Sequence, residues 1–187
     1  MAQTLALYEK KILNDEEFPI QLFRNRFRQR GQYFDLHWHE HIELHYVVSG
    51  HTTIKLEQED VLACQGDLVI ANSSILHEGF CDGTPMETLV AIFNMADFSR
   101  ELADKNIIFQ PHIQNDPEIV RIMGTISGEM LRQEIGGRLV CKGCLLQLVA
   151  YLVRHYAREM LDQEDSLRRR KKLERLNIVY QYIERNY

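Results

Sequence analysis

A long apolar run is missing from this sequence. The 187 residues are 45% hydrophobic and 26% charged, but no stretch approaches the roughly 20 consecutive apolar residues that cross a bilayer. The first residues lack the apolar segment of a signal peptide and become charged at Glu9. We therefore expect a cytoplasmic protein without membrane contact, and its length is sufficient to bury one sizeable core.

Cysteine is scarce and is not grouped as a metal or redox site requires. Of the four cysteines, only Cys141 and Cys144 are close in sequence. A structural zinc site normally needs a second pair or nearby histidines, and a redox pair usually stands at a helix start after a strand. We expect free thiols on a helix.

Positive charge is scarce outside the last residues. Residues 165–187 hold seven basic and three acidic residues, so this tail carries +4, and residues 1–164 carry −9 of the total of −5. The body is a poor partner for nucleic acid, whereas the tail is basic enough to lie near phosphate. A solvated linker has the same charge, so charge alone leaves both interpretations open.

What is abundant is β-forming sequence, and it fills the first half of the chain. Short runs of β-branched and aromatic residues alternate with turn-forming residues. We expect strands over 18–27, 32–48, 52–57, 61–64, 68–71, 76–80 and 87–94. Many short strands without helices between them are typical of an antiparallel sandwich or barrel.

From Asp97 onward, apolar residues recur at helical spacing. Asp116 followed by Pro117 is a typical helix start. We expect helices over 97–105, 116–134 and 138–161, a polar break over 163–166, and a last helix from Leu167. The expected fold class is therefore mainly β with C-terminal helices.

The helix expected over 138–161 carries a wide apolar stripe. Its members are Leu145, Leu148, Val149, Leu152, Tyr156 and Met160. We expect one edge to pack on the preceding helix and the other to form the interface of a homodimer. Coverage of both edges within one chain is the alternative.

Ionisable side chains alternate with apolar ones over 36–48. On a strand, alternate residues share one face, and here that face carries His37, His39, His41, Glu43 and His45. Histidine nitrogens and a carboxylate are ligands for zinc, nickel, iron or manganese. His77 is the candidate for a fourth ligand beside His37, His39 and Glu43, while His45 is a candidate pocket wall. A wet strand face also carries polar residues without any ligand, and the residues leave open whether a pocket would hold metal or an organic molecule.

The spacing His37-x-His39-x-x-x-Glu43, with Gly50, Gly66-Asp67 and His77, resembles the two cupin motifs. This resemblance implies a double-stranded β-helix barrel whose four ligand positions converge inside. Two usual residues of the second motif, a proline before its histidine and an asparagine after it, have no counterpart here. The run from Tyr46 to Gly50 and the order of barrel, helices and linker look like the sensor domains of AraC-type transcription regulators. Residues 176–187 are similar to the first helix of that family's DNA-binding domain.

This resemblance implies three parts. Residues 1–95 form a sensor barrel with an N-terminal arm, 96–164 form a helical dimerisation segment, and 165–187 form a linker and the first helix of a helix-turn-helix domain whose remainder is absent. A small polar effector, a sugar or an organic acid, would bind without being turned over and would control DNA binding by that missing domain. The positions implied for the effector are His37, His39, Glu43 and His77, and His45 is added to them as a candidate pocket wall. Two other functions stay open: a cupin metalloenzyme of dioxygenase or isomerase type, and a dimerisation module with an unused pocket.

Overall fold

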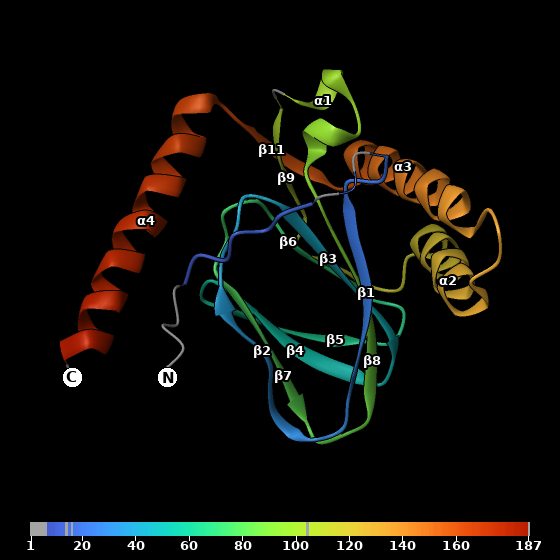
Figure 1. Cartoon of the computed structure of the whole chain (residues 1–187), viewed down its shortest axis with the longest axis horizontal. Coiled ribbons are helices and arrows are strands. Elements are labelled where there is room, and N and C mark those ends of the chain that lie inside the picture. The colour runs from blue at the N-terminus through green and yellow to red at the C-terminus, as the bar shows by residue number, and fades with distance from the viewer. Residues whose placement is uncertain (1–6, 14, 16, 104, 187) are drawn as a thin grey trace.

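Two antiparallel sheets face each other in the computed structural model, which describes residues 7–13, 15, 17–103 and 105–186 (Figure 1). The five-stranded sheet has the order β1-β8-β3-β6-β10, and the four-stranded sheet has the order β2-β7-β4-β5. The strands are β1 (Ile20–Phe27), β2 (Arg30–His37), β3 (Ile42–Ser49), β4 (His51–Leu56), β5 (Glu59–Cys64), β6 (Leu68–Ala71), β7 (His77–Asp82), β8 (Met86–Phe93) and β10 (His112–Ile113). The expected mainly β fold, with helices after a cupin-like barrel, is confirmed.

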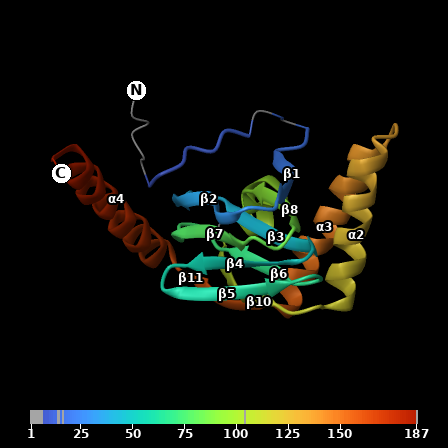
Figure 2. The same cartoon turned by 90° about the horizontal axis from the view of Figure 1, so that it is seen from below.

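Helices flank the barrel on two sides. They are η1 (Met95–Asp97), α1 (Arg100–Ala103), α2 (Pro117–Arg132), α3 (Gly137–His155) and α4 (Gln163–Asn186). The strands β9 (Asn106–Phe109) and β11 (Ala157–Leu161) pair as a separate sheet. Helices α2 and α3 lie on one side of the barrel and α4 stands on the other (Figure 2). Over the described residues, none of these helices is long and apolar enough to span a membrane.

The five-stranded sheet is buried on both faces. Its outer face packs on α2 and α3, where Leu44, Leu89 and Phe93 meet Ile122 and Leu148. Its inner face shares the barrel interior with the four-stranded sheet, through Val47, Ile54, Leu56, Val61, Ala63, Val69 and Ala71. Alternate residues of β3 therefore point into the barrel, and none of its ionisable side chains faces open water.

The single strand expected over 32–48 is wrong. The chain forms β2 in the four-stranded sheet, leaves the strand conformation over 38–41, and enters the five-stranded sheet as β3. This crossing carries the chain from one sheet to the other. His37 and Glu43 consequently approach each other from opposite walls, which strict alternation along one strand does not describe.

Helix boundaries also differ from those expected. Helix α2 begins at the Asp116 cap, whose carboxylate accepts from the backbone N–H groups of Glu118 and Ile119, but it ends at Arg132 because Gln133 turns left-handed with φ 53°. Helix α3 ends at His155, and the following residues form β11, which pairs with β9. The helix expected over 97–105 is reduced to η1 and α1, and the expected polar break over 163–166 is the first turn of α4.

The apolar stripe of α3 faces the chain's own core. Leu145, Leu148, Val149 and Leu152 are buried there, and the hydroxyl of half-buried Tyr156 donates to Asp116 at 2.6 Å. The protomer thus already covers four of the five residues expected in a dimer interface, and dimerisation through α3 stays a prediction. Met160 lies in β11 and is exposed. The expected free thiols are confirmed, with Cys141 buried and Cys144 half-buried on α3.

The N-terminal arm joins the barrel to α4. Leu7 and Glu9 bond to the backbone of Trp38, and the backbone N–H of Leu7 donates to Oδ1 of Asn177 on α4 at 2.9 Å. Leu7, Trp38 and Leu173 form a small buried cluster beside these bonds. The arm is thus a short strap between the start of the β2–β3 crossing and the C-terminal helix.

Candidate functional site

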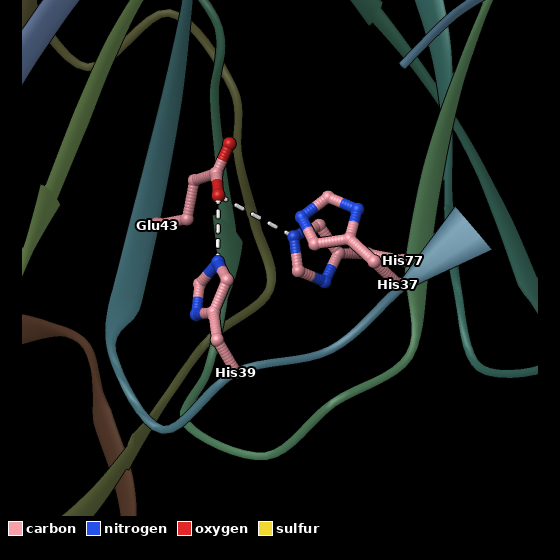
Figure 3. Close-up of side chains that lie close together, drawn as sticks. All are labelled: His37, His39, Glu43 and His77. Carbon is pink, nitrogen blue, oxygen red and sulfur yellow. Dashed lines mark hydrogen bonds and ion pairs between the residues drawn. The ribbon is translucent and has the colours of Figure 1, made fainter. Parts of the chain in front are cut away.

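Three histidines and a glutamate meet inside the barrel (Figure 3). His37, His39, Glu43 and His77 each offer a ligand atom, and these atoms all lie within 4.8 Å of one another. Oε2 of Glu43 lies 2.9 Å from Nε2 of His39 and 3.4 Å from Nε2 of His77. Three of the four residues are buried, and His37 is half-buried. We call these four residues the barrel cluster.

Each member of the barrel cluster comes from a different piece of the fold. His37 closes β2 and is paired with His77 at the start of β7, so their rings lie with centroids 4.2 Å apart. Glu43 projects from β3 in the opposite sheet, and His39 stands in the crossing between β2 and β3. The four positions implied by the cupin resemblance are thus brought together by both sheets and the crossing.

Backbone carbonyls set the orientation of the three histidine rings. Nδ1 of His37, His39 and His77 lies 2.7, 3.2 and 2.9 Å from the carbonyl oxygens of residues 35, 41 and 75, respectively. A carbonyl only accepts, so each Nδ1 donates to its carbonyl, and this bond turns each Nε2 toward the interior of the cluster. This is the arrangement that metal-binding histidines adopt, with the second nitrogen held by an outer partner. The cluster therefore fits a divalent transition metal.

The electrostatics favour the ligand forms of these groups. Burial, followed by the neighbouring charge of His77, lowers the pKa of His37 to about 4, so this ring is neutral at pH 7. Burial alone would raise the pKa of Glu43, but His45, His39 and His77 around it hold that pKa well below its usual range. Glu43 is therefore an anion, although its residue is only 4% exposed.

His45 and His41 lie outside the barrel cluster. His45 is fully buried on β3, its ring stacks on Phe34 at 5.2 Å, and its Nε2 lies 3.1 Å from Oε1 of Glu43. That nitrogen is not aligned for a hydrogen bond, so His45 acts on Glu43 through charge and packing, as a wall residue. His41 is half-buried; its backbone carbonyl accepts from His39, and its ring meets that of His39 edge-on with centroids 5.9 Å apart.

Sequence reasoning missed one carboxylate beside the cluster. Oε2 of Glu9, on the N-terminal arm, lies 3.0 Å from Nε2 of His37, although this nitrogen, like that of His45, is not aligned for a hydrogen bond. Glu9 is held there because its backbone N–H donates to the carbonyl of Trp38 at 3.0 Å. Nothing in the residue pattern signals this contact, because the arm carries no motif and reaches the site only through the fold.

Comparisons with known proteins agree with this architecture. Residues 19–149 match the family model described as AraC-like ligand binding domain. Comparison with curated proteins gives no match.

Several solved structures align with part of the chain. A predicted oxalate decarboxylase from Thermotoga maritima is 24% identical over 39% of this chain and 64% of its own, with a TM-score of 0.37. The plu4264 protein from Photorhabdus luminescens is 20% identical over 42% and 66%, with a TM-score of 0.39. A salicylate 1,2-dioxygenase mutant from Pseudoaminobacter salicylatoxidans is 18% identical over 44% and 24%, with a TM-score of 0.38. The chain spans less than two thirds of the length of each.

Proposed function

Because the chain belongs to the family of AraC-like ligand-binding domains, we propose that it is the sensor of a transcription regulator and not an enzyme. His37, His39, Glu43 and His77 would hold a divalent metal, and a small polar effector such as a sugar or an organic acid would bind beside it. The observation that carries the proposal is the convergence of these four ligand atoms within 4.8 Å of one another, and Glu9 of the arm lies beside one of them.

The metal would act as a Lewis acid that binds a hydroxyl or carboxylate oxygen of the effector. The chain's own residues supply the remaining interactions. Hydrogen bonds to backbone carbonyls orient the three imidazoles. Glu43 would balance the positive charge of the ion, and His45 with Phe34 forms one wall of the site. Small polar molecules bind with high specificity at such sites because a few fixed groups meet them in a dry cavity.

The arm gives the site a route to α4. A ligand that engages His37 competes with Glu9 for the same ring nitrogen, and release of Glu9 loosens the strap that continues through Leu7 to Asn177. A second connection runs from Glu40, which accepts from the hydroxyl of Tyr8 at 3.1 Å and pairs with Arg170 of α4 at 3.3 Å. Binding can bias DNA binding by a domain following α4 only through such differential contacts.

The division into a barrel with its arm (1–95), a helical dimerisation segment (96–164) and a linker helix (165–187) belongs to this proposal. In this proposal, the homodimer surface lies on the solvent side of α3, where Leu139, Val140 and Leu146 are exposed, and not on the buried stripe. The barrel and the helices α2 and α3 share one apolar core, so we expect the first two parts to fold as one unit.

A metalloenzyme is the second candidate function. The half-buried position of His37 and the carboxylate of Glu9 beside it favour it, because displacement of Glu9 would give a substrate access to this side of the cluster.

The test is a screen of sugars and organic acids on the zinc-loaded chain by thermal melting, followed by mass spectrometry of each compound that binds. Recovery of the unchanged compound, with a raised melting temperature, supports the sensor. Conversion of the compound into a product establishes the enzyme and contradicts the proposal. His51→Gln, a half-exposed histidine on β4, is the control for unspecific metal binding, while His39→Gln should lose the response.

A further inference from the structure

A second pocket lies outside the barrel cluster, where the end of the barrel meets α4. It opens to solvent, and no member of the barrel cluster lines it. Three separate parts of the chain line it: the start of β3 with the residues after β6, the segment from Asn94 to β9, and the first turns of α4. A molecule in this pocket would therefore touch α4 and the body of the protein at once.

Two cations line this pocket without a carboxylate partner among the described residues: Lys105, before β9, and Arg169, on α4. The neighbouring arginines of α4 are paired, Arg168 with Glu164 at 2.6 Å and Arg170 with Glu174 at 2.9 Å. Of the three consecutive arginines 168–170, Arg169 is the one that lines the pocket, and it is also the one without a carboxylate partner among the described residues.

The guanidinium of Arg169 has an unsatisfied nitrogen. Its Nη1 is buried and has no hydrogen-bond partner among the described residues. A buried donor without a partner costs on the order of 1–3 kcal/mol, and more for a charged group, so such groups call for an explanation in a native fold. Glu40 also lines the pocket, but its carboxylate is already engaged by Tyr8 and Arg170.

The remaining lining groups define the chemistry of a ligand. Ser166 stands one turn before Arg169 on the same face of α4, and both line the pocket. Ile42 and Ile107 provide apolar wall on the opposite side. These groups suit a carboxylate or phosphate carried on a small apolar body.

We propose that this pocket is a second ligand site, which takes a small organic anion between Arg169 and Lys105. An ion bound there satisfies the free guanidinium nitrogen and fastens α4 to the segment before β9. The site acts on the same helix that the arm holds, but from the other end and without any residue of the barrel cluster. This inference rests on the pocket and its unpaired charges and does not depend on the proposed function.

The test is isothermal titration of the full chain with two probes, benzoate for the carboxylate class and inorganic phosphate for the phosphate class. Saturable binding of one of the probes is expected. Arg169→Gln and Lys105→Gln should each weaken it about tenfold or more, because each removes a charge-assisted bond. Arg168→Gln is the matched control, since it makes the same charge change one residue earlier at a position that does not line the pocket. The affinity of the Arg168→Gln variant for the probe should stay within about twofold of wild type.

Several outcomes overturn the proposal. One is that neither probe binds saturably, and another is that Arg168→Gln weakens binding as much as Arg169→Gln, which indicates an adventitious ion held by diffuse charge. His39→Gln should retain the anion while losing zinc. If that variant loses both, the anion sits in the barrel cluster and the second site does not exist. Circular dichroism checks that each variant is folded.

Discussion

At the scale of single residues, Glu43 is the group on which the barrel cluster depends. It is the one anion among His37, His39, His45 and His77, and its two carboxylate oxygens face different rings. Replacement by glutamine keeps the shape but removes the charge and one metal ligand. We expect Glu43→Gln to weaken zinc binding at least tenfold, measured by competition with a chelating dye. Equal zinc affinity in this variant and in wild type would show that the metal binds elsewhere.

His37 makes the protein less stable in mild acid. Burial, followed by the charge of His77, lowers its folded-state pKa to about 4, whereas the unfolded chain titrates near 6.5. Between these values the unfolded chain binds a proton that the folded chain does not bind. The free energy of unfolding therefore falls as the pH falls from about 6.5 to about 4, and this contribution levels off below that.

The corresponding variant is His37→Gln. Urea denaturation at pH 7 and pH 4.5 should show a loss of stability about 2 kcal/mol smaller in the variant than in wild type. His51→Gln should leave the loss nearly unchanged. The same loss in His37→Gln and in wild type would mean that another group carries the acid sensitivity.

The candidate ligands could be found from sequence, but not their surroundings. His37, His39, Glu43 and His77 stand at motif spacing, and that spacing is local. Glu9 reaches His37 only because the arm bonds to Trp38, and the unpaired state of Arg169 depends on which of its neighbours find carboxylates. Such contacts are set by the packing of distant segments, which a single sequence does not display.

At the scale of elements, Asp116 fixes the start of α2 and the end of α3 together. One carboxylate oxygen caps α2, while the other accepts from the hydroxyls of Tyr151 at 3.0 Å and Tyr156 at 2.6 Å. The bond to Asp116, followed by burial, raises the pKa of Tyr156 to about 12. The two helices are therefore tied at the point where each meets a loop.

Removing that carboxylate should be costly. Asp116→Ala deletes the cap and both tyrosine bonds, and we expect a loss of about 3 kcal/mol in the free energy of unfolding by urea denaturation. Asp116→Asn retains a capping oxygen and should lose only about 1 kcal/mol. A loss in Asp116→Ala no larger than in Asp116→Asn would show that the capping oxygen contributes little.

Elements were predicted best where their pattern is strongly periodic. The strand expected over 68–71 has those bounds as β6, and Asp116 with Pro117 marked the start of α2 correctly. The strand β10 was missed because two residues are too few for periodicity to show, and β9 was missed because its partner β11 lies in a segment where a helix was expected. The end of α3 was missed because pairing between β9 and β11 overrides the helical pattern over 157–161.

At the scale of the whole molecule, the two sides of α3 should have different roles. Its buried apolar stripe stabilises the fold, and its exposed side forms the proposed homodimer. Leu152 is 1% exposed and Leu146 is 42% exposed on the same helix. Leu152→Glu buries a charge in the core and should unfold the chain or destabilise it by several kcal/mol. Leu146→Glu should keep the fold by circular dichroism and abolish the proposed homodimer in light scattering. A Leu146→Glu variant that remains dimeric would place the interface on another surface.

The most direct test of the account uses Trp38, the one tryptophan of the sequence. Its indole is buried and packs on Tyr8 of the arm at 4.7 Å, next in sequence to His37 and His39. Zinc binding in the barrel cluster should displace Glu9, loosen the arm and change the emission of Trp38. The account predicts a saturable change in wild type that is retained in His51→Gln and lost in Glu43→Gln. No change in wild type, or the same change in Glu43→Gln, would contradict the claim that this cluster is a binding site coupled to the arm.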